Sequence, residues 1–192
     1  MDGNKYIQDW RAYVTRHRLK VAIVGGLVAT HVTTNMGMWY HGIFNLPDLN
    51  FNILNGYLVF GNSGMDPKGM SDPVWLTLFG ALAHYAMGVC FALIYAFGIY
   101  PLLPIASTVV GNIGKAIIWG LILATLSAVW WINLFPNLGG AGVSAGLFMV
   151  NLHDGVHEWW QWTIAVYLWH IVYGFNLGAF YQPLPDPSPA SA

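Results

Sequence analysis

Charged side chains are scarce in this 192-residue chain: they make up 8% of it, whereas soluble domains carry about a quarter. Asp, Glu, Lys and Arg are absent from four long stretches, residues 21–47, 73–114, 116–153 and 159–185. A helix needs about 20 predominantly apolar residues to cross a bilayer, and each stretch is long enough. The sequence therefore predicts an all-α integral membrane protein.

Cysteine is also nearly absent, since Cys90 is the single one and no disulfide can form within the chain. Acidic and basic residues are missing from the middle of every predicted span, which argues against a proton pump or an ion-coupled carrier. The sequence contains no phosphate-binding loop, dinucleotide fingerprint, nucleophile elbow or covalent-haem motif. These absences favour a protein that is not an enzyme.

The apolar stretches predict four transmembrane helices, with approximate bounds 20–40, 73–99, 112–134 and 158–181. We expect them to form one domain over residues 1–182. A long outer loop joins the first two helices, and its apolar residues 50–62 predict a short interfacial helix or a re-entrant segment. The Pro- and Ser-rich residues 183–192 predict a disordered tail.

Basic residues are concentrated before the first span, where five of the seven are found: Lys5, Arg11, Arg16, Arg18 and Lys20. Cytoplasmic segments of membrane proteins collect Lys and Arg. We therefore expect a multi-pass protein of the inner, cytoplasmic membrane with both termini in the cytoplasm. Topology and anionic lipid account for the basic segment, so no nucleic-acid partner is expected.

The pattern H-x3-G-x6-Y occurs twice, beginning at His84 and at His170. These positions lie in the second and fourth predicted spans. The pattern predicts a duplicated helical hairpin, whose two halves would be related by an axis along the membrane normal.

Three histidines, His31, His84 and His170, each lie some ten residues from the outer end of their predicted span. At 1.5 Å per residue, all three are expected at about 15 Å depth. An imidazole there is costly to bury, so it should face the bundle interior and have a partner. The partner is either a neighbouring helix, through a hydrogen bond, or a cofactor such as haem b or chlorophyll.

Glycines accompany two of these histidines: Gly88 follows His84, and Gly174 and Gly178 follow His170. Small residues allow two helices to approach closely. They also leave room for a flat macrocycle beside the imidazole. The sequence leaves both interpretations open.

A second polar cluster precedes the last span, in the stretch HDGVHE. On a helix, His153 and His157 would share one face, and with His41 they predict a divalent metal site on the outer side. In the alternative, Asp154 and Glu158 complement the dipole of a helix that begins there. The tryptophans that follow predict an anchor at the membrane interface.

The final motif H-x2-Y-G-x3-G, from His170 to Gly178, and the Gly-rich spans resemble small four-pass prokaryotic membrane proteins over most of residues 20–182. The resemblance implies the four-pass fold and no particular reaction. We therefore expect a non-catalytic accessory or scaffold subunit beside other subunits of a respiratory, oxygenase or photosynthetic membrane complex. The alternatives are a b-type haem or chlorophyll electron-transfer protein, an outer-face metal-binding protein, and a small channel.

Overall fold

The structure is a computed structural model that describes residues 3–49, 51–60, 73–134, 145–152 and 154–185. Within these ranges the chain is helical and contains no strand. The α-helices are α1 (Gly3–Arg16), α2 (Arg18–Phe44), α3 (Phe51–Phe60), α4 (Pro73–Ile94), α5 (Val109–Leu126) and α6 (Trp159–Phe180). The π-helical turns are η1 (Tyr95–Ile99) and η3 (Ser127–Trp131), and the 3-10 turns are η2 (Tyr100–Leu102), η4 (Ile132–Leu134) and η5 (Leu147–Met149).

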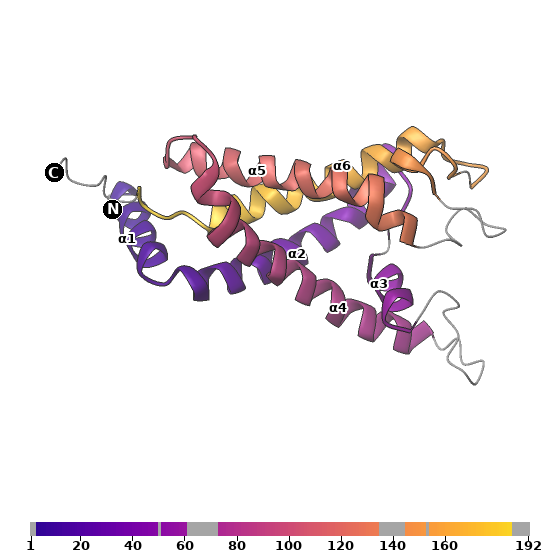
Figure 1. The fold of residues 1–192 in the computed structure, drawn as a ribbon, viewed down its shortest axis with the longest axis horizontal. Coiled ribbons are helices and arrows are strands. Elements are labelled where there is room, and N and C mark those ends of the chain that lie inside the picture. Colours follow the sequence, from indigo (N-terminus) through magenta and orange to yellow (C-terminus); the bar gives the residue numbers. More distant parts are fainter. Residues whose placement is uncertain (1–2, 50, 61–72, 135–144, 153, 186–192) are drawn as a thin grey trace.

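Among the described residues, four helical segments are long and apolar enough to cross a membrane: Arg18–Phe44, Thr77–Leu102, Val109–Leu134 and Trp159–Phe180. They overlap the four predicted spans, so an all-helical architecture with four such helices is confirmed for the described part of the chain. The four candidate spans alternate in direction, and α1 lies at the same end of the bundle as the segment that follows α6 (Figure 1). This arrangement is consistent with a multi-pass membrane protein.

Glycines let α5 and α6 pack with their backbones in contact. A Cβ atom on Gly120 would lie 2.3 Å from the backbone oxygen of His170, and one on Gly174 would lie 2.4 Å from that of Ala116. On the other pair of helices, a Cβ on Gly88 of α4 would lie 1.8 Å from Oγ1 of Thr30 in α2. The room beside these glycines is therefore filled by a neighbouring helix, as in small-residue helix packing.

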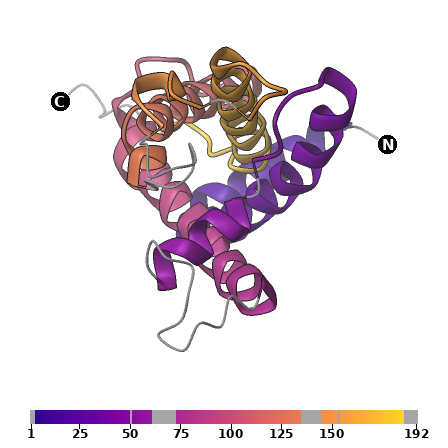
Figure 2. The same ribbon diagram turned by 90° about the vertical axis from the view of Figure 1, so that its right-hand side faces the viewer.

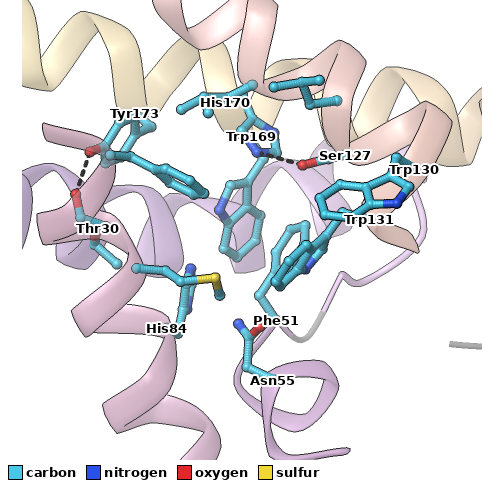
Figure 3. A pocket seen from close by; sticks show the side chains of 15 residues that line it. Thr30, Phe51, Asn55, His84, Ser127, Trp130, Trp131, Trp169, His170 and Tyr173 are labelled. Atoms are coloured by element: carbon cyan, nitrogen blue, oxygen red, sulfur yellow. Dashed lines mark hydrogen bonds between the residues drawn. The ribbon is translucent and has the colours of Figure 1, made fainter. Parts of the chain in front are cut away.

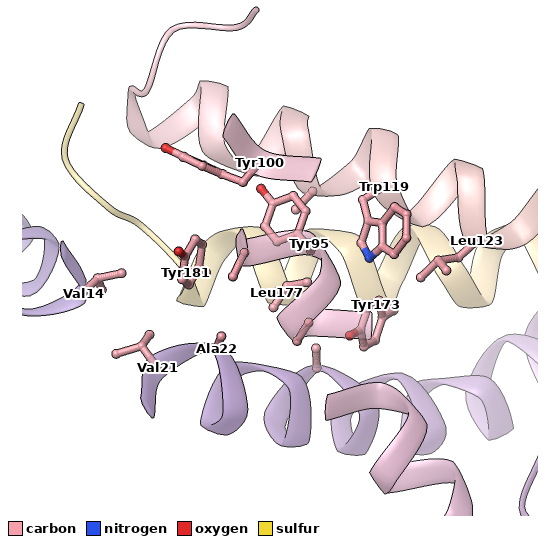
Figure 4. Close-up of a cluster of buried hydrophobic side chains, with 14 residues drawn as sticks. Val14, Val21, Ala22, Tyr95, Tyr100, Trp119, Leu123, Tyr173, Leu177 and Tyr181 are labelled. Carbon is pink, nitrogen blue, oxygen red and sulfur yellow. The ribbon is translucent and has the colours of Figure 1, made fainter. Parts of the chain in front are cut away.

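The end of the bundle near α1 is closed by buried polar and aromatic side chains. Asn112 is 0% exposed: its Nδ2 donates to Oε1 of Gln182 (3.1 Å) and to the carbonyl of Pro183 (3.2 Å), and its Oδ1 accepts from Tyr100 (2.8 Å). The rings of Tyr95, Tyr100 and Tyr181 pack edge to face beside it (Figure 4). The buried carboxamide of Asn112 is tolerated there because both its oxygen and its nitrogen have hydrogen-bond partners.

Helix α1 was not predicted as a separate element, because the basic residues hide its apolar face in the sequence. Trp10 stacks on Tyr13 and donates from Nε1 to the backbone oxygen of Phe180 (3.1 Å). Arg11, which is 8% exposed, donates to the backbone oxygens of Ser107 and of Pro183. The helix is thereby attached to the end of α6 and to the segment before α5.

The segment after α6 packs into this same end. Pro183 is fully buried, and the backbone N–H of Leu184 donates to Oγ1 of Thr15 (2.8 Å). The first residues of the predicted tail are therefore packed against α1, and residues 186–192 lie outside the described part of the chain.

Helices α3 and α4 form a pair that diverges from the rest of the bundle at its other end. They are in close contact, since a Cβ on Gly80 would lie 1.6 Å from the backbone oxygen of Asn52. Figures 1 and 2 show α3 and the beginning of α4 on the side away from α5 and α6. In the candidate span Thr77–Leu102, which contains most of α4, 22% of the apolar stretch is buried inside the bundle, against 39–47% in the other three spans. The divergence leaves space inside the bundle.

Candidate functional site

A cavity of about 180 Å³ lies in this space, between α3, α4 and the α5–α6 pair (Figure 3). Its aromatic lining consists of Phe51, Phe91, Trp130, Trp131, Trp169 and Tyr173. The polar side chains that line it are Thr30, Asn55, His84, Ser127 and His170. Two of the three histidines predicted to hold a cofactor therefore line one cavity.

His170 lies on α6 and is 8% exposed. Its Nδ1–H donates to the backbone oxygen of Val166, one turn earlier (2.8 Å). The other ring nitrogen, Nε2, accordingly carries the lone pair and accepts from the hydroxyl of Ser127 (3.1 Å; Figure 3). Both ring nitrogens have protein partners, so His170 has a fixed tautomer and a fixed orientation.

His84 lies on α4, and its Nδ1–H donates to Oδ1 of Asn52 on α3 (3.0 Å). This leaves Nε2 as an acceptor for which no described residue supplies a donor. The ring of Phe51 lies near both imidazoles, with centroids 5.8 Å from His84 and 6.2 Å from His170. Nε2 of His84, a residue of the cavity lining, thus carries a lone pair that no described residue uses.

Asn55 on α3 is a buried asparagine whose carboxamide has no hydrogen-bond partner among the described residues. It is 0% exposed, and neither Oδ1 nor Nδ2 has a hydrogen-bond partner among the described residues. It lines the cavity together with Phe51 (Figure 3). Leaving a buried polar group unpaired costs about 1–3 kcal/mol, so a full carboxamide without partners calls for a ligand or an ordered water.

Three lining residues come from the π-helical turn η3. Its wider winding interrupts the regular α-helical register, so that Ser127, Trp130 and Trp131 all line the cavity. Such turns are often found at functional sites. The sequence does not mark these residues or Asn55 as part of a ligand site, because a π turn has no simple sequence signature and the pairing of an amide depends on the tertiary fold.

The third predicted histidine, His31, lies elsewhere. Its Nδ1 forms a hydrogen bond with the hydroxyl of Tyr85 (2.7 Å), and its Nε2 lies 3.2 Å from Nδ2 of Asn35. The side chain is exposed and does not line the cavity. The structure therefore brings together His84 and His170 and leaves His31 on another face of the bundle.

The size of the cavity limits what can occupy it. An apolar cavity of about 150 Å³ accepts a molecule such as benzene. The present cavity is only slightly larger, at about 180 Å³, and a tetrapyrrole contains four pyrrole rings. The cavity therefore suits a ligand with a single aromatic ring, and a haem or chlorophyll held by His84 and His170 stays a prediction.

Two of the three histidines predicted to bind a metal on the outer side lie close together. The rings of His41 and His157 lie side by side, with centroids 6.4 Å apart, and His153 lies outside the described residues. Within the described ranges, no group of three or more His, Cys, Asp or Glu side chains is placed to hold one metal ion.

Residues 154–158 are not helical, although the predicted metal site placed His153 and His157 on one face of a helix. Oδ1 of Asp154 accepts from the backbone N–H groups of Val156 (2.8 Å) and His157 (2.6 Å), and Gly155 has φ +81°. This turn ends where Glu158 caps α6. The carboxylate of Asp154 also accepts from Nδ1 of His157 (2.7 Å), and this bond lowers the pKa of Asp154 to about 2.

Comparisons of the chain with protein-family models, with curated proteins and with solved structures found no match.

Proposed function

We propose that the chain is a multi-pass protein of the inner membrane, with α1 and residues 181–185 on the cytoplasmic side. Large apolar side chains are exposed on the outward faces of the bundle, among them Leu82, Leu126 and Phe175. Lipid would cover this surface and remove its contact with water. The basic residues before α2 support the orientation.

Cysteine labelling in intact cells or sealed vesicles tests this topology. Cys90 is exposed on α4, yet it should not react with a membrane-impermeant maleimide, because lipid surrounds it. In a Cys90→Ser background, cysteines placed at Asp9 and at Glu158 should be labelled from opposite sides of the membrane. Labelling of both from one side would contradict the proposed topology.

We further propose that the protein binds a small lipophilic molecule with one aromatic ring that carries a hydroxyl or carbonyl group. The unpaired, fully buried carboxamide of Asn55 at the cavity is the observation that carries this proposal. Its Nδ2 can donate to a carbonyl, and its Oδ1 or Nε2 of His84 can accept from a hydroxyl. The rings of Phe51 and Trp169 supply apolar contact for the ligand.

The test compares two ligands of nearly the same shape, para-fluorophenol and para-fluorotoluene, by fluorine NMR of the protein in lipid nanodiscs. We expect the phenol to bind up to about tenfold more tightly than the toluene, which corresponds to one net hydrogen bond. Asn55→Leu should abolish most of this preference. Asn176→Leu is the matched control, because Nδ2 of Asn176 bonds only to its own helix, at Val172 (2.8 Å), away from the cavity.

Empty nanodiscs give the partition of both ligands into lipid. The proposal fails if the two ligands bind the protein equally, or if Asn55→Leu and Asn176→Leu have the same effect on the preference.

A second candidate function, an accessory or scaffold subunit of a membrane complex, is favoured by the exposure of α4. The span that includes this helix is the least buried of the four, and its outward side chains include Leu82. A photoreactive amino acid at Leu82 should cross-link to another subunit in native membranes. The same group at Phe175 on α6, which is similarly exposed, is the control. Cross-linking only to lipid at both positions would contradict the subunit proposal.

We also propose that the chain is a duplicated hairpin, α2–α4 and α5–α6. The matched histidines of the two patterns, His84 and His170, line one cavity, and the matched tyrosines, Tyr95 and Tyr181, pack with ring centroids 5.9 Å apart. Contacts between equivalent positions are expected when two similar halves meet about an axis.

A further inference from the structure

Two imidazoles from different elements meet at the end of the bundle opposite α1. His41 lies in the last turn of α2, and His157 lies just before the capping residue of α6. A hydrogen bond from Nε2 of Gln161 to the backbone oxygen of Asn45 (2.9 Å) connects the end of α2 to the beginning of α6. This contact holds the two helix ends together and supports the 6.4 Å separation of the two rings.

Both imidazoles have their Nδ1 atoms fixed by oxygen acceptors. His41 donates from Nδ1 to the backbone oxygen of Leu46, and His157 donates from Nδ1 to the carboxylate of Asp154. In each ring Nε2 is then the atom with the lone pair. Metal-binding histidines show this same arrangement, in which the outer ring N–H is held by a carbonyl or a carboxylate.

The Nε2 atom of His157 is buried and has no hydrogen-bond partner among the described residues. The residue as a whole is 8% exposed, and the edge-on ring of Trp162 lies 6.3 Å from it. A buried acceptor without a donor is unfavourable. A cation bound to this atom, or a water molecule that donates to it, would remove the penalty.

We propose that His41 and His157 bind one copper or zinc ion through their Nε2 atoms, with Asp154 as a positioning residue. Imidazole suits both metals, and late first-row ions bind nitrogen ligands most tightly. Two rings that share an ion through bonds of about 2.1 Å have centroids about 5 to 6.5 Å apart. The observed 6.4 Å lies at the upper end of this range, which corresponds to two imidazoles on nearly opposite sides of the ion. A tetrahedral ion would draw the two rings about 1 Å closer together.

The ion would join the ends of α2 and α6 that the Gln161 contact already brings together. The site is separate from the cavity, because neither His41 nor His157 lines it. The inference is therefore independent of the proposed aromatic ligand, and either proposal can fail alone.

The test uses the purified full chain in nanodiscs, titrated with Cu²⁺, Zn²⁺ and, as the negative arm, Mg²⁺. We expect one Cu²⁺ or Zn²⁺ per chain and no binding of Mg²⁺. The electron paramagnetic resonance spectrum of the Cu²⁺ form should show hyperfine coupling to two imidazole nitrogens.

Variants assign the ligands. His41→Ala and His157→Ala should each abolish stoichiometric binding, and Asp154→Asn should weaken it about 10- to 100-fold, as expected for the partner of a metal ligand. His17→Ala is the matched control, because this exposed histidine follows α1 at the other end of the bundle. His41 is the more exposed of the pair, so His41→Ala decides the test if His157→Ala does not fold.

Binding that survives both alanine substitutions would overturn the proposal, as would a spectrum with a single coupled nitrogen. Absence of Cu²⁺ and Zn²⁺ binding by the wild-type chain would also overturn it, and would assign the unpaired Nε2 of His157 to a hydrogen bond from water.

Discussion

Asn55 and Asn112 allow a direct test of how buried polar groups affect the stability of this bundle. Both are asparagines with 0% exposure, but within the described part of the chain the carboxamide of Asn55 is unpaired and that of Asn112 is fully hydrogen-bonded. Asn55 has no partner for its carboxamide among the described residues. The carboxamide of Asn112 forms three hydrogen bonds, to Tyr100, Gln182 and Pro183. Replacing each with leucine should therefore change the free energy of unfolding in opposite directions.

Asn55→Leu removes an unpaired polar group, and the adjoining cavity of about 180 Å³ can accept the larger side chain. We expect the ligand-free protein to become more stable by about 1–3 kcal/mol, the penalty for an unsatisfied buried group. Asn112→Leu breaks three bonds and leaves their partners unpaired, so we expect a loss of about 2–4 kcal/mol. The assay is reversible unfolding in mixed micelles by increasing SDS, followed by tryptophan fluorescence.

A loss of stability in ligand-free Asn55→Leu comparable to that in Asn112→Leu would refute the reasoning. It would mean that the carboxamide of Asn55 forms hydrogen bonds in the empty protein. The cavity would then lack the polar group on which the ligand proposal depends.

Two further predictions concern helix packing and pH. Gly120→Ala should cost about 1–3 kcal/mol of unfolding free energy through overpacking, because its Cβ would lie 2.3 Å from a backbone oxygen of α6. Gly114 is the control on the same helix, because a Cβ there would meet no atom within 4 Å. Gly114→Ala should stabilise the protein by up to about 1 kcal/mol. Equal SDS midpoints of unfolding for the two variants would contradict the packing argument. The pKa of Asp154 is lowered from its ordinary value of 3.8 to about 2. The ionised carboxylate therefore stabilises the fold at pH values above 3.8, and this stabilisation is lost as the pH falls through about 2. The unfolding free energy of Asp154→Asn should therefore fall less steeply over this range than that of the wild type, and identical slopes would show that the bond to His157 does not stabilise the fold.

The four apolar helices could be predicted because absence of charge over some twenty residues is a strong, local signal. Helix α1 could not be predicted as a separate element because basic residues hide its apolar face in the sequence. The contacts that place this face, such as the hydrogen bond from Trp10 to Phe180, are long-range. The hairpin of α3 on α4 depends on the close approach of Gly80 to Asn52, which sequence alone does not reveal. Local composition thus predicted which segments are apolar and helical, and long-range packing decided how they meet.

The candidate site was predicted only in part, for a geometric reason. Position along a span predicts the depth of a histidine and gives no information about the rotation of its helix. His84 and His170 face one cavity, whereas His31 is paired with Tyr85 on a different face. The unpaired amide of Asn55 could not be foreseen, because only the folded chain determines which polar groups find partners.

The closure of the bundle end by residues after α6 has a consequence for biogenesis. Arg11 and Thr15, near the beginning of the chain, bond to Pro183 and Leu184, which the ribosome adds about 170 residues later. During translation, all four apolar helices must be made before α1 acquires these partners. Helix α1 is therefore synthesised before the partners that anchor it, and these contacts can form only after α6 is complete.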